Sequence, residues 1–440
     1  MEYLIKERNK EGILFIEKTL VDTETMKQIR AMIKHEAIEN ARIMPDCHKG
    51  NGCCIGFTSQ LVDKIVPNFV GGDIGCGIVS YPLDLEKSIK PKQLDRHIRS
   101  VVPLGTHTNI DLIDIDRYMD RIYDLANQDA DTFVKFYLEK FKIDIAKQKP
   151  YYSTEWFNEL CTRIKTDKEH DLKSLGSLGG GNHFIGVNRS ESGKEYLTVH
   201  SGSRNLGQKI CRYHQDIITN GRELDWDDFD EKVKKFSRDC KEKKKLNTYK
   251  DELRKEMNAK RHPDYLIKEE AFNYYFDMIF AQKYALVNRE IMIERSIDYY
   301  DLEFNPEKKI ESIHNYIDFN DFILRKGAIS ANQDKICLIA LNMIDGILLC
   351  KGKGNERWNN SSAHGSGRII TRQKALKSKI PIVKRLAKDF EDNDIYSTSN
   401  LEDIVDEAPE CYKETDLIKE LIEPSVEVIE QLKPVLNIKG

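Results

Sequence analysis

The chain has 440 residues, of which 69 are basic and 73 acidic, so that its formal net charge is -4. This balance excludes a nucleic-acid partner recognised through bulk positive charge, and any such surface must be local. A hydrophobic content of 40% is enough for a large core and excludes a chain that is disordered throughout.

The sequence contains no apolar run long enough to span a membrane and no apolar leader at its N-terminus. We therefore expect a cytoplasmic protein without a membrane partner. The ten cysteines are scattered and include no CxxC pair. In a reducing compartment this pattern predicts free thiols, most of them buried, and no disulfide framework.

The N-terminal part alternates between helix and strand signals. Residues 22–35 predict a helix capped by Asp22, because apolar residues recur at helical spacing behind it. From residue 44 to 81 glycines separate short β-branched runs, of which 64–66 and 78–81 are the clearest. This texture predicts strands joined by tight loops.

Two polar helical insertions are expected, at about 108–170 and 215–300, on either side of a glycine-rich patch with a strand at 196–200. Within the second insertion, residues 231–260 carry 12 basic and 6 acidic residues. We favour a solvated helical face there, and an RNA-contacting arm is the alternative. A further helix is predicted from Asp264, directly after Pro263.

The C-terminal part predicts a hairpin and a docked tail. Residues 336–350 form two apolar runs around Asp345-Gly346, which is a hairpin signal. Residues 423–432 resemble a helix, and the apolar tail behind them predicts that the terminus packs against the body. The chain as a whole predicts a mixed α/β fold of one unit, 1–440, since no composition break marks a linker.

Histidines coincide with glycine-rich or polar loops at five places: His48, His183, His200, His314 and His364. Asp73 and Cys76 lie three residues apart in a further loop with four glycines, GGDIGCG. Taken singly, each is more often a surface or packing residue. Together they are typical of a divalent transition-metal site, and the softness of a thiolate by itself points to zinc.

The segments HSGSR and HGSGR share one plan, in which an arginine follows a histidine and small residues. The small residues can form an anion-binding nest, and Arg204 and Arg368 can bind a phosphate in bidentate fashion. The alternative is two ordinary turns with surface arginines. Two such segments favour a site that holds more than one phosphate.

Ten motifs occur in one order, and together they resemble the RtcB-type RNA ligase family over residues 44–440. They are MPDCHKGNG, GGDIGCG, SLGGGNHF, VHSGSRNLG, HN at 314–315, RKGA at 325–328, GKGN-xx-WN-x-S, HGSGR, DEAP-xx-YK and LKPVLNIKG. The resemblance implies a single α/β fold with a deep metal-lined cleft that uses GTP and two manganese ions, in place of zinc. It implies that an RNA 3′-phosphate or 2′,3′-cyclic phosphate is joined to a 5′-hydroxyl.

The resemblance also implies a role for each matched residue. His364 would attack the α-phosphate of GTP, and the guanylate would then pass to the RNA 3′-phosphate, from which the 5′-hydroxyl displaces GMP. The implied metal ligands are Asp73, Cys76, His183, His200 and His314, with Cys76 bridging two ions. The implied nucleotide contacts are Asn182, Arg204, Arg368, Tyr412 and Lys439. Asp46 and His48 match a catalytic or RNA-positioning segment at the cleft mouth.

The sequence departs from the family pattern at several positions. Gly186 stands where the family usually has Glu, Ser362-Ala363 replaces Ala-Pro before the histidine, and Ser366 replaces Ala after it. The segment PLGTHT adds His107 where a Gly-Val-Gly-like loop is usual. These differences indicate a divergent branch, such as a repair paralogue.

Two other functions remain open at this stage. One is a metal-dependent phosphodiesterase that opens the cyclic phosphate without ligation, and GTP-dependent product would separate it from a ligase. The other is an RNA-binding repair factor with a structural metal, which would not need an extra histidine in an anion nest. We expect a monomer, leave an activating protein partner open, and cannot assign the RNA that is sealed.

Overall fold

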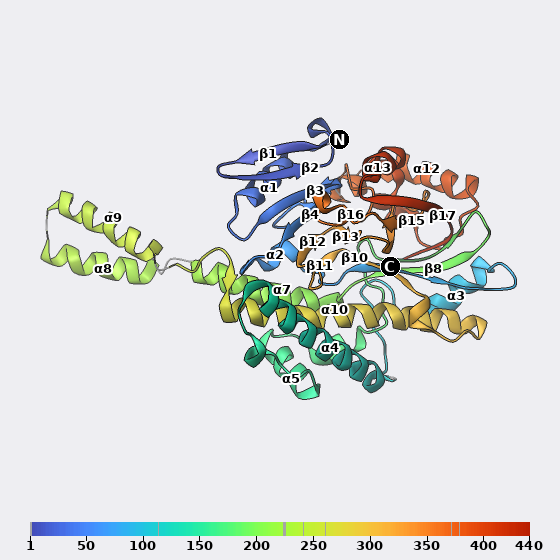
Figure 1. The fold of residues 1–440 in the computed structure, drawn as a ribbon, viewed down its shortest axis with the longest axis horizontal. Helices are drawn as coiled ribbons and strands as arrows, with labels where there is room; N and C mark the ends of the chain where they lie inside the picture. The colour runs from blue at the N-terminus through green and yellow to red at the C-terminus, as the bar shows by residue number, and fades with distance from the viewer. Residues whose placement is uncertain are drawn as a thin grey trace.

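The computed structural model describes residues 2–112, 114–222, 226–240, 242–259, 261–370, 372–377 and 379–440. Figure 1 shows two β-sheets side by side, a layer of helices along one side of them, and a helical hairpin that projects from the body. Two further pairs of strands are β5 (Lys64–Ile65) with β9 (Leu266–Ile267), and β13 (Ala328–Ser330) with β16 (Ser361–Ala363). None of the described helices is both long and apolar enough to cross a membrane.

The first sheet has six strands in the order β1-β2-β3-β4-β12-β11. Their bounds are β1 Tyr3–Glu7, β2 Lys10–Leu14, β3 Glu39–His48, β4 Ile55–Gln60, β12 Ile323–Lys326 and β11 Asn315–Asp318. Helix α1 (Thr23–Lys34) begins where predicted, because the Asp22 carboxylate accepts hydrogen bonds from the N–H groups of Glu24 and Thr25, each at 3.0 Å.

The second sheet has seven strands in the order β10-β6-β8-β7-β17-β15-β14. Their bounds are β10 Ile310–Ile313, β6 Gly77–Pro82, β8 Glu195–Ser201, β7 Phe184–Arg189, β17 Val426–Lys439, β15 Ile347–Gly352 and β14 Ile336–Ala340. The predicted strands at 64–66, 78–81 and 196–200 are confirmed as β5, β6 and β8.

The C-terminal segment docks as predicted, but not as a helix. Residues 423–425 form a turn, and strand β17 begins at Val426. Its residues 426–432 pair with β15, and its residues 433–439 pair with β7. The helix prediction was wrong because tertiary pairing outweighs the local helix preference of a short Glu-rich stretch. The result is a central strand that carries the chain's last residues into the middle of the sheet.

Helix α10 (Lys268–Ile297) is the central helix of the body, and its side chains are buried on all faces. It packs against α4 (Ile115–Phe141) and α7 (Arg204–Arg222), and its last turns contact the second sheet through Met292, Ile293 and Ile297. The predicted start at Asp264 was wrong, since Leu266–Ile267 pairs with β5 before the helix begins. Strand pairing thus delays the helix by one turn.

The predicted hairpin is confirmed as β14 and β15, although its turn is longer than an Asp-Gly dipeptide. The connection runs over 341–346, where Gly346 has φ +82° and its N–H bonds the carbonyl of Asn342. The remaining helices are α2 Pro67–Val70, α3 Pro91–Val101, α5 Thr154–Arg163, α6 Lys168–Lys173, α11 Arg372–Lys377, α12 Lys379–Asp392 and α13 Thr415–Ile422.

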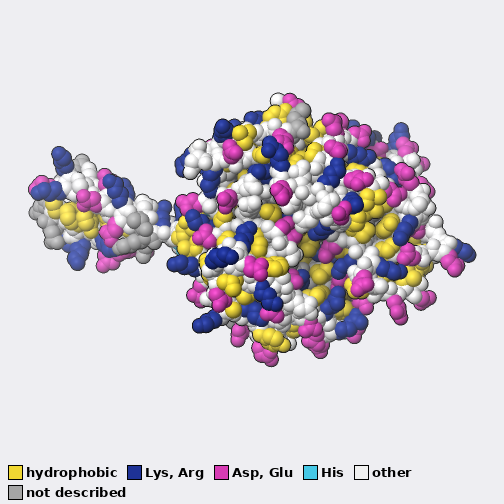
Figure 2. All heavy atoms as spheres, viewed as in Figure 1, with side chains coloured by type: hydrophobic (Ala, Val, Ile, Leu, Met, Phe, Trp, Pro, Cys, Tyr) yellow, Lys and Arg dark blue, Asp and Glu magenta, His cyan; other side chains and the backbone are white. Residues whose placement is uncertain are grey.

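The two segments predicted as helical insertions, at about 108–170 and 215–300, are mostly helical in their described residues. The first contains α4, α5 and α6, and the second contains α7, the hairpin of α8 (Trp226–Asp239) with α9 (Lys243–Ala259), and α10. Residue 113 of the first insertion and residues 223–225, 241 and 260 of the second lie outside the described residues. We call the α8–α9 hairpin the arm; Figures 1 and 2 show that it stands away from the body.

Candidate active site

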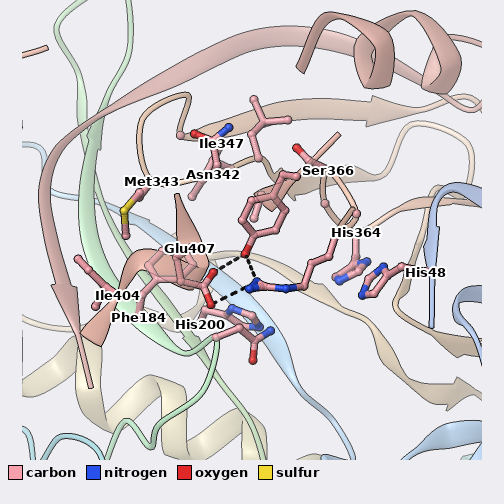
Figure 3. A pocket seen from close by; sticks show the side chains of 18 of the residues that line it. His48, Phe184, His200, Asn342, Met343, Ile347, His364, Ser366, Ile404 and Glu407 are labelled. Carbon is pink, nitrogen blue, oxygen red and sulfur yellow. Dashed lines mark hydrogen bonds and ion pairs between the residues drawn. The ribbon is translucent and has the colours of Figure 1, made fainter. Parts of the chain in front are cut away.

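A cavity of about 790 Å³ lies where the two sheets meet. Figure 3 shows side chains from several segments pointing into it, including His48, His200, His364 and Glu407. Predicted site residues that line it are His48, Asn182, His200, His364, Arg368, Tyr412 and Lys439. Seven of the polar side chains that sequence motifs singled out therefore converge on one apolar-walled cavity, as is usual for small-molecule sites.

The antiparallel pairing of the second sheet explains why distant histidines meet. The first residue of β6, Gly77, pairs with Ser201 near the end of β8 and with Ile313 at the end of β10. Phe184, which begins β7, pairs with His200. The residues next to these strand ends therefore share one edge of the sheet.

Cys76, His183 and His200 form a buried cluster at that edge, in which one ligand atom from each lies within 4.8 Å of the others. The Sγ of Cys76 is 3.5 Å from Nε2 of His183 and 3.4 Å from Nε2 of His200. Asp73 joins through Oδ2, 3.0 Å from Nε2 of His183, and His314 joins through Nε2, 3.4 Å from that of His200. The five predicted ligands are thus together.

The residues of this cluster are oriented by groups behind them. Nδ1 of His183 lies 2.9 Å from the carbonyl oxygen of Leu178, which directs Nε2 toward the cluster. The buried Arg289 donates to the carbonyls of Gly75 and Ser201, both at 2.8 Å. Arg289 belongs to none of the sequence motifs. The available signal was a charged residue within a long apolar helix.

Burial shifts the pKa values of several groups in the cluster. It lowers the pKa of His200 and His314 well below the usual value, and it raises that of Cys76 well above. Burial also acts to raise the pKa of Asp73, but hydrogen bonds from His183 and from the Ser203 N–H outweigh it, so the net shift is downward. Neutral imidazoles, a carboxylate and a thiol that can lose its proton are a donor set that fits a borderline transition metal.

His364 lies beside this cluster, directly after β16. Its ring centroid is 4.8 Å from that of His314. Nδ1 of His364 is 2.6 Å from Oδ2 of the fully buried Asp46, and the same oxygen accepts the His364 N–H at 3.2 Å. The carboxylate thereby fixes the ring so that Nε2 is the nitrogen left for other contacts.

His48 is the last residue of β3, and His200 lies within β8. Neither histidine therefore lies in a loop, although the sequence had suggested that both do. Nδ1 of His48 lies 2.9 Å from the backbone carbonyl oxygen of Asp46. Burial lowers the pKa of His48 to about 4, so its ring is neutral at physiological pH. Asp46 therefore contacts both imidazoles, one through its side chain and one through its backbone.

Glu407 organises the far end of the cavity, and the sequence analysis gave it no role. Its carboxylate accepts a hydrogen bond from the Tyr412 hydroxyl and lies 3.6 Å from Nη1 of Arg368 and 3.5 Å from Nζ of Lys439. Arg368 also donates to the Tyr412 hydroxyl at 2.9 Å. Glu407 stands five residues before Tyr412 in the DEAP-xx-YK motif, and that place in a recognised motif was the available signal.

Two predicted nucleotide contacts differ in position. Asn182 lines the cavity and is exposed there, whereas Arg204 does not line it. The Arg204 guanidinium packs under residue 179, donating from Nε to Ser177 Oγ at 3.1 Å and from Nη2 to the Gly105 carbonyl at 3.4 Å. A Cβ at Gly179 would overlap Nη1 of Arg204, so glycine is required for this packing.

The residues that depart from the family pattern lie in different surroundings. Gly186 faces Asn437 across β7 and β17, and a Cβ there would lie 2.8 Å from the Leu436 carbonyl oxygen, so a larger side chain requires a shift. The Ser362 hydroxyl accepts a hydrogen bond from Ser425 at 2.9 Å, away from the cavity lining. His107 is exposed and does not line the cavity.

Known proteins with similar sequences point to one family. The family described as "tRNA-splicing ligase RtcB" matches residues 28–440. The chain is 27% identical to the RNA-splicing ligase RtcB of Escherichia coli (strain K12) over 448 residues, which cover 96% of this chain and 93% of that protein. It is 25% identical to the tRNA-splicing ligase RtcB of Methanococcus maripaludis, covering 90% of this chain and 87% of the relative.

Proposed function

This chain belongs to the RtcB family, and we propose from that membership that it is an RNA ligase. It joins an RNA 3′-phosphate or 2′,3′-cyclic phosphate end to a 5′-hydroxyl end, with GTP as co-substrate. The observation that carries the proposal is His364, held by the Asp46 carboxylate at the edge of the metal-ligand cluster and inside the cavity.

In the first step, Nε2 of His364 attacks the α-phosphate of GTP. A P–N bond forms, the bond between the α- and β-phosphates breaks, and pyrophosphate leaves with its electron pair. Asp46 supports this step because a carboxylate on Nδ1 stabilises the positive charge that the ring acquires as Nε2 forms a bond. A phosphoramidate is labile enough to pass the guanylate to the RNA 3′-phosphate.

Asp73, Cys76, His183, His200 and His314 would hold two manganese ions, with their side chains close together at one edge of the sheet. Bound there, the ions would neutralise phosphate charge and orient the reacting phosphorus. A purely structural metal would need a closed set of ligands and no neighbouring nucleophile, whereas here His364 lies beside the cluster.

Asn182, Arg368, Tyr412 and Lys439 would hold the nucleotide, since all four line the cavity. Tyr412 and Lys439 would contact the base, and Arg368 would contact phosphate. Arg204 would act on the nucleotide by positioning the 177–181 loop that precedes Asn182, because its guanidinium bonds Ser177.

The test is incubation of the protein with GTP labelled at the α-phosphate, with and without manganese and before any RNA is added. We expect a labelled protein adduct that depends on manganese, is acid-labile and is stable in alkali, as a P–N bond is. His364→Ala should lose the adduct but still join RNA whose 3′ end already carries guanosine through a 3′-pp-5′ linkage. Cyclic-phosphate opening without an adduct would instead identify a phosphodiesterase, and an alkali-labile adduct would place the nucleophile on a serine such as Ser362 or Ser366.

A further inference from the structure

One residue, Asp46, orients two imidazoles in the cavity by two different groups. Its carboxylate lies 2.6 Å from Nδ1 of His364, and its backbone carbonyl oxygen lies 2.9 Å from Nδ1 of His48. The backbone around Asp46 is itself fixed, because Nζ of the buried Lys413 donates to the carbonyls of Pro45 and Cys47 at 2.9 and 2.8 Å. The two rings are therefore held rigidly relative to each other.

The backbone contact determines the tautomer of His48. A carbonyl oxygen can only accept, so Nδ1 of His48 carries the hydrogen and Nε2 keeps its lone pair. Burial lowers the pKa of His48 to about 4 and keeps the ring neutral. Since His48 lines the cavity, it offers a hydrogen-bond acceptor beside the proposed nucleophile.

The cavity has two ends. In Figure 3 the imidazole rings of His364 and His48 lie next to each other at one end, and Glu407 lies at the other. The Glu407 end contains Arg368, Tyr412 and Lys439, where the nucleotide is proposed to bind. An in-line displacement at a phosphate beside His364 places the attacking oxygen opposite the leaving group. When GMP leaves toward the Glu407 end, the attacking hydroxyl arrives at the His48 end.

Other acceptors at that end are already engaged. The Asp22 carboxylate caps helix α1, accepting from Glu24 and Thr25. Glu24 is bonded to Lys27 at 2.7 Å. The Asp46 oxygen that faces His364 accepts from that ring and from two backbone N–H groups. The other Asp46 oxygen, Oδ1, has no hydrogen-bond partner in the described part of the chain, but Asp46 is fully buried and does not line the cavity. Nε2 of His48 also has no such partner among the described residues, and His48 does line the cavity.

We propose that His48 receives the proton of the RNA 5′-hydroxyl in the joining step. This inference rests on the proposed function and assigns a chemical role that the motif resemblance left undecided. The hydroxyl oxygen forms a bond to the phosphorus of the guanosine-activated RNA end, and the bond from that phosphorus to the oxygen of GMP breaks. GMP leaves with the electron pair, the hydroxyl proton passes to Nε2 of His48, and His48 then releases it to solvent.

The test separates the joining step from formation of the His364 adduct. His48→Asn keeps a donor near the Nδ1 position but removes the Nε2 acceptor, and His48→Gln offers an amide acceptor that cannot take the proton. Joining of RNA already activated with guanosine is measured in a single turnover, and adduct formation is measured without RNA. His107→Asn is the matched control, because His107 is exposed and outside the cavity.

In both His48 variants we expect joining to slow by about 10²- to 10⁴-fold, the usual contribution of a general base, and adduct formation to change much less. An RNA acceptor with a 5′-thiol should restore joining in His48→Asn, because a thiol with a pKa near ~8.5 ionises without help from a base. A residue with only a structural role would not be rescued in this way.

Three results would overturn the assignment of His48: joining at the normal rate in His48→Asn, full activity in His48→Gln, or no advantage of the thiol acceptor. If His364→Ala no longer joins activated RNA, the role of proton acceptor belongs to His364 instead of His48. If the unaltered protein forms no adduct with GTP, the proposed function itself fails and the inference with it. The adduct assay therefore distinguishes the two failures.

Discussion

The cavity and the arm are built in opposite ways. The cavity is assembled from residues far apart in the chain: the Asp46–His364 contact joins positions 318 residues apart, and the Cys76–His200 contact joins positions 124 apart. The arm is local, held by contacts between adjacent helices such as the stacked rings of Phe236 and Tyr249, with centroids 4.1 Å apart. The side chains proposed to act together are thus brought together where strand ends that are far apart in the sequence meet.

The largest expected effect comes from Cys76 in the cavity region, and Cys240 in the arm is its matched control. Cys76→Ala removes the thiol shared by His183 and His200. We expect adduct formation with GTP to fall below detection, since loss of even a supporting group costs about 10- to 100-fold at metal sites. Cys240→Ala, between the two helices of the arm, should leave adduct formation unchanged. Both variants are compared by adduct yield and by thermal unfolding. Equal behaviour of the two would mean that Cys76 is not a metal ligand.

The next effect concerns the carboxylate behind His364. Asp46→Asn should lower the rate of adduct formation by roughly 10³-fold, because an amide supports the wrong tautomer of the ring and cannot stabilise its positive charge. Adduct formation is followed in a time course with labelled GTP and manganese. Asp264→Asn, at an exposed aspartate that lies 3.6 Å from His35 outside the cavity, is the matched control. An unchanged rate in Asp46→Asn would show that His364 does not depend on this contact.

Sequence motifs identified the residues at the strand ends but not the groups that hold them. The five proposed metal ligands and His364 were singled out because histidine, cysteine and aspartate coincide in glycine-rich or polar segments, and the family resemblance then implied their roles. Arg289 and Glu407 were missed, since one is an arginine in an apolar helix and the other one acid among many. Their roles follow from long-range contacts, which local patterns do not encode.

The same limit explains the errors in the fold. Residues 423–432 have helix-compatible composition, and only the pairing of residues 426–432 with β15 makes most of them a strand. Residues 266–267 continue a helical pattern and yet pair with β5. By contrast, helix α1 was predicted within one residue at each end, because its Asp22 cap and its apolar face are local features.

A smaller effect is expected from Glu407, which lies at the nucleotide end of the cavity. Glu407→Gln should raise the KM for GTP about tenfold, equivalent to about 1.4 kcal/mol, because Arg368, Tyr412 and Lys439 lose a shared carboxylate. Removal of Lys439 and Gly440 should likewise weaken GTP use more than RNA binding. Adduct yield is titrated against GTP, with Glu402→Gln at the surface as the control. A change in RNA affinity with an unaltered KM for GTP would assign this end of the cavity to RNA.

The smallest effect is expected in the arm, where we favour a solvated helical face over an RNA-contacting surface. Lys234, Lys235 and Lys244 are exposed near its tip, and none of the described arm residues lines the cavity. Exposed charges act over only about 10 Å at moderate salt. Changing these three lysines together to Glu should therefore leave adduct formation unaltered and change the joining rate of a long RNA by less than about twofold. The control is a variant in which the body residues Lys87, Lys92 and Lys147 are changed to Glu. We expect the arm variant to change the joining rate no more than this control does. The measurement is RNA affinity and joining rate as functions of salt concentration.

An RNA-contacting arm predicts a different result, in which the arm variant alone would bind long RNA more weakly. The slope of log affinity against log salt would also become shallower, by about 0.7 for each RNA phosphate that the arm no longer neutralises. That result would extend the functional surface from the sequence-distant strand ends of the cavity to a locally folded hairpin, and the contrast between the two regions would no longer hold.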